Sequence, residues 1–275
     1  MKRILAGLMG VALAASATSA TDPIAIQIGQ RSASVFIQLP PNLSVDFSLA
    51  FEQVSGLTEQ SIGLSAGFVD PTNAALLARL PQGASIPAAF PVLIAVEPPS
   101  IGPLSFTGVV AISLLTPNLV WTPGTPLRLF AAPLGGEFVD ITSGTSAGSY
   151  RAGASKGGFS EFLVVSDLRA VDTVIAQKFD RLQSKLNQYA LAIPASIKAD
   201  LQARLEAARS SYVAGNPQHA ALTIDGFAAT VQQHGDTEIP NIWRASRDVT
   251  NIAGELRSGA ATLSYSLGLK ASSGS

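Results

Sequence analysis

One pentapeptide of the sequence has the spacing of a catalytic serine. Gly144-Thr145-Ser146-Ala147-Gly148 matches G-x-S-x-G, the nucleophile elbow, in which the serine stands on a sharp turn between a strand and a helix. Residues 149–158 include three glycines. Each glycine destabilises a helix by about 1 kcal/mol relative to alanine. Residues 153–157 match the same pattern a second time, as expected by chance where glycine and serine are abundant. We therefore expect a flexible loop joining two edge strands, and we assign no catalytic residue.

The same pentapeptide resembles the motif of the patatin-like lipases, which pair GTSAG with an Asp-Gly dipeptide further along the chain. Asp225-Gly226 supplies such a dipeptide. The resemblance implies a serine hydrolase with Ser146 as nucleophile. Asp225 falls inside a predicted helix, away from the strand that should carry the elbow. We keep hydrolysis as an alternative and favour a chain that is not an enzyme.

The two histidines lack the spacing of a metal site. His219 is expected in the first turn of a helix, and His234 in the last turn of the same helix, where positive charge complements the helix dipole. His234, Asp236 and Glu238 lie in one short segment, whereas a stable site needs three or four preorganised ligands. The sequence predicts no metal ligand. It also has no phosphate loop or dinucleotide motif, and we expect no cofactor.

A tryptophan is the residue that best suggests ligand binding. Trp121 precedes Thr122-Pro123-Gly124, a turn-forming sequence that would leave its ring exposed. Aromatic rings of this kind provide platforms for glycans and other ligands. The alternative is a largely buried ring, as tryptophan usually is.

The N-terminus has the three regions of a signal peptide. Lys2 and Arg3 supply positive charge, and residues 4–15 form an apolar run shorter than the roughly 20 residues that span a bilayer. Small residues follow, and we expect cleavage after Ala20, with cleavage after Ala17 as the alternative frame. The mature protein is then expected in the periplasm of a bacterium or outside the cell, without a membrane span.

Composition limits the partners of the mature chain. There is no cysteine, which excludes disulfides and thiolate metal sites. Loss of Lys2 and Arg3 leaves 16 basic and 19 acidic residues, a net charge of −3. Such a chain is not basic enough to follow a phosphate backbone, so nucleic acid is not expected as a partner. A protein or glycan partner stays open.

Residues 21–165 have the pattern of short β-strands. Val45, Phe47, Leu49 and Phe51 alternate along one run, which places them on one face of a strand. Strands are expected over residues 35–39, 45–51, 62–68, 90–97, 104–115, 127–131, 138–142 and 159–165. Runs at intervals of roughly 8–12 residues, separated by proline and glycine turns, are typical of an antiparallel sandwich. We predict an Ig-like β-sandwich domain.

Residues 166–270 have the period of α-helices. The first apolar stripe consists of Val171, Val174, Ile175, Phe179, Leu182, Leu186 and Tyr189. Three further helices are expected, beginning after Pro194, at Pro217 and near Asn241. Short connections make neighbouring helices antiparallel, so we predict an up-and-down bundle of about four helices, followed by a disordered tail over residues 271–275. The predicted fold class is all-β plus all-α, in two domains.

Residues 176–235 resemble the small helical modules called FIMAH domains. The resemblance rests on Lys178, Leu182, Leu205, Ala208, Gly215-Asn216, Ala220-Ala221, Phe227, Val231 and Gly235. These modules stand at the C-terminal end of many secreted bacterial enzymes and surface proteins. The resemblance implies an accessory, non-catalytic role.

The whole chain is also similar to an uncharacterised family of exported bacterial proteins, through residues 135–138, 158–162 and 239–245. That family implies no activity. We therefore expect an exported non-catalytic protein that serves as an interaction or accessory module. The alternatives are a glycan or small-ligand binding module that uses the sandwich loops, and a serine hydrolase that uses Ser146.

Overall fold

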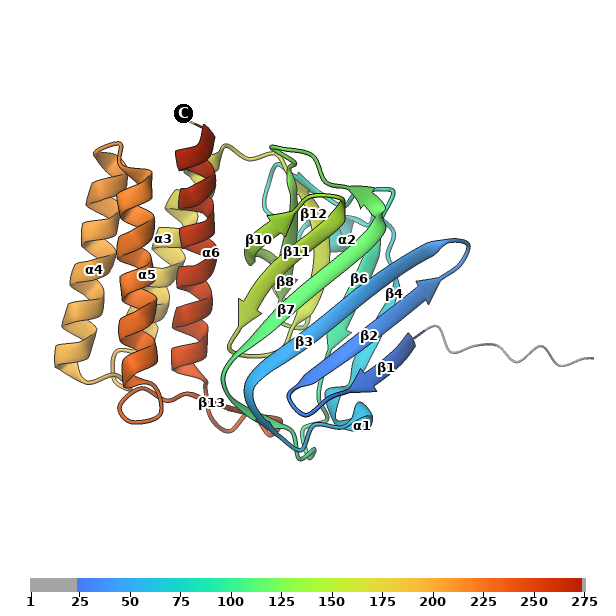
Figure 1. Cartoon of the computed structure of the whole chain (residues 1–275), viewed down its shortest axis with the longest axis horizontal. Helices are drawn as coiled ribbons and strands as arrows, with labels where there is room; N and C mark the ends of the chain where they lie inside the picture. The colour runs from blue at the N-terminus through green and yellow to red at the C-terminus, as the bar shows by residue number, and fades with distance from the viewer. Residues whose placement is uncertain (1–23, 274–275) are drawn as a thin grey trace, which may run out of the picture.

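The computed structural model describes residues 24–273, and two antiparallel sheets form its larger part (Figure 1). The expected cleavage site at Ala20 lies outside the described residues. The seven-stranded sheet has the order β1 (Ile24–Ile28), β2 (Ser32–Leu39), β3 (Leu43–Ser55), β7 (Ser105–Val120), β11 (Ser149–Lys156) and β10 (Thr142–Ser146), and β13 (Ile242–Arg244) also pairs with β7. The six-stranded sheet has the order β4 (Leu64–Phe68), β6 (Val92–Val96), β12 (Glu161–Asp167), β8 (Leu127–Ala132) and β9 (Val139–Asp140), and β5 (Ala84–Ser85) pairs with β12.

Alternating apolar residues explain why the two sheets pack face to face. On β2, Ala33, Val35, Ile37 and Leu39 are buried, and the residues between them are exposed. The rings of Phe47 on β3 and Phe162 on β12 lie 5.5 Å apart, so one core is filled from both sheets. Burial of this apolar surface is the main favourable term for the sheets.

Four long helices follow the strands. They are α3 (Val171–Gln188), α4 (Ala195–Val213), α5 (Pro217–His234) and α6 (Ile252–Ser273), and the short helices α1 (Glu59–Ile62) and α2 (Ala74–Leu77) lie between strands. The long helices share a second core, which contains Phe179, Leu205 and Phe227. Gly215 turns the chain between α4 and α5 with a φ of 83°, a left-handed conformation that favours glycine. Among residues 24–273, no helix has the length and apolar character needed to span a bilayer.

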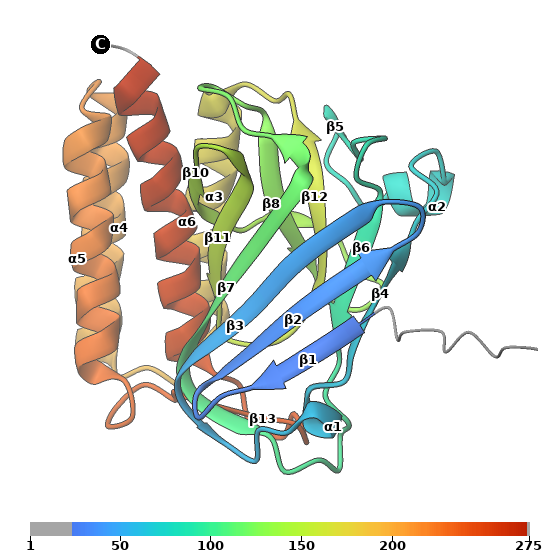
Figure 2. The same cartoon turned by 45° about the vertical axis from the view of Figure 1, so that its right-hand side comes forward.

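Helix α6 lies between the α4–α5 pair and the strands (Figures 1 and 2). It approaches β11 so closely that a Cβ atom added to Gly157 would lie 2.5 Å from the backbone nitrogen of Glu255. Arg257 on α6 donates two hydrogen bonds to Glu52 on β3, at 2.6 and 2.9 Å. The helices are therefore attached to the sheets along the length of α6.

The chain also returns to the sheet between α5 and α6. Strand β13 pairs with β7, and the indole of Trp243 stacks on Phe106 with 5.3 Å between ring centroids. The segment that was expected to begin the fourth helix near Asn241 is a strand, and α6 begins at Ile252.

The predicted fold class is wrong. The chain does not divide into an Ig-like sandwich followed by a four-helix bundle, because the fold is mixed: two large antiparallel sheets are combined with helices, and a strand of the later part completes the earlier sheet. Periodicity identified the type of most elements, but it contains no information on which elements pair or pack together. The polar residues of α3 and α6 that contact strands supply the missing attachment.

One local expectation is also wrong. Residues 144–158 are not a flexible loop, because Thr142–Ser146 and Ser149–Lys156 form a hairpin whose second strand pairs with β7. Helix α3 begins at Val171 without a side-chain cap, and just before it the Asp167 carboxylate accepts two hydrogen bonds from Arg169, at 2.6 and 2.8 Å.

A candidate binding cavity between helices and sheets

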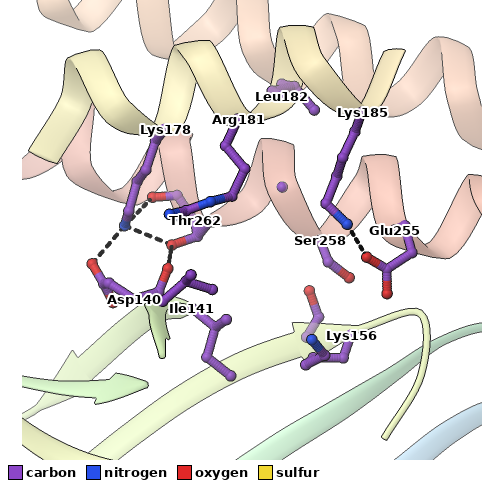
Figure 3. A pocket seen from close by; sticks show the side chains of 13 residues that line it. Asp140, Ile141, Lys156, Lys178, Arg181, Leu182, Lys185, Glu255, Ser258 and Thr262 are labelled. Carbon is purple, nitrogen blue, oxygen red and sulfur yellow. Dashed lines mark hydrogen bonds and ion pairs between the residues drawn. The ribbon is translucent and has the colours of Figure 1, made fainter. Parts of the chain in front are cut away.

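A cavity of ≈ 70 Å³ lies where α3 and α6 pack on β9, β10 and β11 (Figure 3). At this corner the chain crosses through Ile141 from the six-stranded sheet, which contains β9, to the seven-stranded sheet, which contains β10. The cavity therefore has walls from both sheets and from two helices.

Helical spacing brings charged and polar groups to the cavity. Lys178, Arg181 and Lys185 follow one another at intervals of three and four residues on α3, so they share one face. Glu255, Ser258 and Thr262 have the same spacing on α6. Val139, Asp140, Ile141, Ser155, Lys156, Leu182 and Gly259 complete the lining.

A buried ion pair closes one end of the cavity. The Lys178 ammonium donates to Asp140 Oδ2 at 2.6 Å, to Thr262 Oγ1 at 2.6 Å and to Ser266 Oγ at 2.9 Å. The hydroxyl of Thr262 then donates to the carbonyl of Thr142 at 2.9 Å. This network joins α3 and α6 to the strands, and its side chains satisfy each other. Its first role is structural.

The charges of this pair are stabilised by each other. Burial alone raises the pKa of Asp140, but the adjacent Lys178 charge and its hydrogen bond lower it, as does a hydrogen bond donated by the Thr142 amide. The net result is a pKa below the ordinary value of an aspartate. Asp140 is therefore ionised at neutral pH, opposite the Lys178 ammonium.

A second ion pair stands on the other side of the cavity. Lys185 on α3 pairs with Glu255 on α6, and about a fifth to a quarter of each side chain is exposed. Burial raises the pKa of Glu255, but the charges of Lys156 and Lys185 lower it, and the net pKa is below the ordinary value. Glu255 is thus a carboxylate with two lysines near it.

Two cations in the lining have no close partner. Within residues 24–273, neither Lys156 nor Arg181 makes a side-chain hydrogen bond or an ion pair. Lys156 is half-buried at the strand side of the cavity, whereas Arg181, which extends from α3, is exposed at its rim (Figure 3). Burial lowers the pKa of Lys156, as do the charges of Lys185 and Arg181, although Glu255 opposes this shift. The nearby carboxylate of Glu255 is already paired with Lys185, so the cost of burying the Lys156 ammonium is only partly compensated.

A larger cavity of ≈ 260 Å³ adjoins the first and shares Val139, Asp140, Lys178 and Arg181 with it. Its other cations have partners: Arg79 pairs with Glu161, and Arg169 pairs with Asp167. Lys178 and Arg181 line both cavities. Of these two cations, Lys178 is paired with Asp140, and Arg181 has no close partner among the described residues.

The residues that the sequence singled out lie elsewhere. Ser146 is exposed at the end of β10 and is followed by a turn and a strand, so the strand–turn–helix geometry of a nucleophile elbow is absent there. Trp121 lies in the loop after β7, half-buried against the core between the two sheets, and its Nε1 is buried without a hydrogen-bond partner among the described residues.

The histidines do not line the ≈ 70 Å³ or the ≈ 260 Å³ cavity either. His219 contacts Ser211 Oγ at 3.0 Å, and His234 pairs with Glu238. Within residues 24–273, no group of three or more histidine, aspartate or glutamate side chains is placed to hold a metal ion.

One signal of the cavity was present in the sequence. Lys178 stands three residues after Ile175 and four before Leu182, in the middle of an apolar stripe. A charge at such a position needs a buried partner. The partner, Asp140, lies 38 residues away on a two-residue strand, and helical periodicity does not find it.

Comparison with known proteins gives a family but no described activity. Neither the curated proteins nor the solved structures contain a match to this chain. A family model matches residues 6–271, almost the whole sequence. The chain belongs to the family described as Family of unknown function (DUF6689).

Proposed function

We propose that this protein is an exported, non-catalytic binding protein of a bacterium, and that its ligand occupies the cavity between α3, α6 and β9–β11. Export to the periplasm or the exterior is supported by the charged start, the short apolar run and the small residues that end at Ala20. An accessory role is supported by the likeness of residues 176–235 to FIMAH modules.

The observation that carries the proposal is the cavity lining. Two cationic side chains border the cavity without a close partner, whereas every other charged group in the lining of the ≈ 70 Å³ cavity is paired. Convergent polar groups with shifted pKa values in a concave site are the usual features of a ligand site. Trp121 offers less support for a glycan site, because its ring packs against the core.

Hydrolysis by Ser146 has no geometric support, because the serine stands in a hairpin. A fluorophosphonate probe tests this directly. We expect no labelling of the wild-type protein, and labelling that disappears in Ser146→Ala would overturn the non-catalytic assignment.

Binding is tested on the mature protein with four small probes: succinate, inorganic phosphate, glucose and choline. Thermal shift detects binding, and amide chemical shifts locate it. We expect at least one probe to stabilise the protein and to move signals of the cavity residues.

Ser258→Leu should abolish the effect, because its side chain would fill the cavity. Ser272→Leu is the matched control, since Ser272 is exposed on the same helix. The proposal fails if none of the four probes binds, or if binding survives in Ser258→Leu.

Export is tested separately by intact mass measurement of the protein recovered from the periplasm and the medium. A mature chain beginning at Thr21 supports the proposal. An intact Met1 contradicts cleavage.

A further inference from the structure

We propose that the ligand of the cavity is a small dianion, a dicarboxylate or a phosphate, whose charge is compensated by Lys156 and Arg181. This inference rests on the proposed function and specifies its ligand. It concerns a site between the helices and the strands that neither the serine motif nor Trp121 indicated.

The charges of the lining lead to a dianion. Four cations border the ≈ 70 Å³ cavity, Lys156, Lys178, Arg181 and Lys185, against the two carboxylates of Asp140 and Glu255. Each carboxylate already pairs with one lysine, Asp140 with Lys178 and Glu255 with Lys185. A surplus of two positive charges remains, and a ligand with two negative charges would neutralise it.

The surroundings strengthen such an interaction. Ile141 and Leu182 form apolar parts of the wall, and Lys156 is half-buried. Ionic hydrogen bonds are stronger where water is excluded. An arginine presents a planar fork of donors that fits carboxylate and phosphate groups, and a lysine supplies a compact charge. The pKa of Lys156 is lowered mainly because its ammonium is buried, and the charge of Glu255 opposes this shift only in part.

The dimensions favour a compact ligand. A cavity needs a free volume of about 10–15 Å³ to hold one water molecule. The ≈ 70 Å³ here corresponds to a few waters or one small charged group. The adjoining ≈ 260 Å³ cavity shares Arg181, so a ligand with a longer polar part would extend in that direction, towards Gln177.

The same charges argue against other ligand classes. A metal cation or choline would meet two uncompensated cations, which repel it. A neutral sugar would leave the surplus positive charge of the lining unbalanced. A dianion is the class that balances this surplus.

Isothermal titration of the mature protein at constant ionic strength tests the inference with succinate, inorganic phosphate, acetate and glucose. We expect succinate or phosphate to bind at least about tenfold more tightly than acetate, a difference of about 1.4 kcal/mol. Glucose should not bind. Tighter binding of succinate identifies a dicarboxylate, and tighter binding of phosphate identifies a phosphate-bearing ligand.

Variants locate the site. Lys156→Gln and Arg181→Gln should each weaken dianion binding at least about tenfold, and the double variant should abolish it. Arg151→Gln is the matched control, because Arg151 is an exposed cation on the same strand as Lys156 and does not line the cavity. Circular dichroism and thermal unfolding confirm that each variant is folded.

Three results would overturn the inference. Dianion binding that survives in the Lys156→Gln, Arg181→Gln double variant would place the site elsewhere. Equal weakening by Arg151→Gln would indicate unspecific attraction. Binding of glucose or choline in the cavity, without dianion binding, would leave the proposed function standing and refute the dianion alone.

Discussion

The Lys178 ammonium and the Asp140 carboxylate lie 2.6 Å apart, with 3% of each side chain exposed. The pair joins the middle of α3 to the two-residue strand β9, and Thr262 of α6 bonds to the same ammonium. Three elements that are distant in sequence are therefore held by one buried cation.

Lys178→Met should destabilise the protein by about 3–5 kcal/mol, because it leaves the Asp140 charge buried without its partner. Urea unfolding measures the change. The double variant Lys178→Met, Asp140→Asn should be more stable than Lys178→Met alone, since it also removes the orphaned charge. As a control, Arg204→Gln breaks the exposed pair with Asp200 and should cost no more than about 1 kcal/mol. A loss for Lys178→Met as small as that of the control would contradict the structural role.

Acid should weaken the same attachment. The pKa of Asp140 is lower in the folded protein than in the unfolded chain, so the unfolded chain binds its proton first as the pH falls. The stability contributed by Asp140 is fully present above about pH 4, the ordinary range of an aspartate, and is lost as the pH falls through the folded pKa. We therefore expect the free energy of unfolding to fall less in Asp140→Asn than in the wild type between neutral pH and about pH 2. The variant has no carboxylate at this position to lose. A pH profile parallel to that of the wild type would refute it.

The close approach of α6 to the end of β11 should depend on the absence of a side chain at Gly157. Gly157→Ala would place a Cβ atom 2.5 Å from the Glu255 nitrogen and 2.7 Å from the Gly254 carbonyl carbon, both backbone atoms. Overpacking of this kind typically costs about 1–3 kcal/mol. Gly144→Ala on β10 is the control, because nothing lies within 4 Å of its added Cβ, and it should cost no more than about 0.5 kcal/mol. Equal stability of the two variants would mean that α6 moves away freely.

The helical core should depend on Phe227. The side chain is 0% exposed and belongs to the same apolar cluster as Leu205 and Phe179. Phe227→Ala should lower the free energy of unfolding by about 3–5 kcal/mol. Leu222→Ala on the same helix is the control, since Leu222 is 65% exposed and its truncation should cost about 0.5 kcal/mol or less. A Phe227→Ala variant as stable as the control would show that this core does not hold the helices together.

The sequence predicted the helices α3, α4 and α5 well, because a 3.6-residue period and the start signals at Pro194 and Pro217 are local. Phe179, which belongs to the apolar stripe predicted for the first helix, is buried in the helical core with Leu205 and Phe227. Most strands of the first part were also placed correctly. Local patterns thus identified the elements, but not their partners.

The failures have a common cause, which is dependence on distant partners. Residues 242–244 form a strand only because β7 offers unpaired backbone groups to them. The glycines after Ser146 suggested a loop, yet residues 149–156 form a strand that pairs with β7, and Gly157 lets α6 approach the end of that strand. Lys156 and Arg181 resemble ordinary surface cations in sequence, and only the packing of helices on strands brings them to one cavity.

The short strand β13 has a consequence for the order of assembly. It comes at residues 242–244, and Arg257 of α6 reaches back 205 residues to Glu52. A nascent chain therefore cannot complete its larger sheet until nearly all of its residues have emerged. Such long-range contacts slow folding and leave apolar strands exposed to aggregation while they wait for their partners. A truncation before β13 should thus impair folding of the sheets themselves, even though most of their strands come from the first 167 residues.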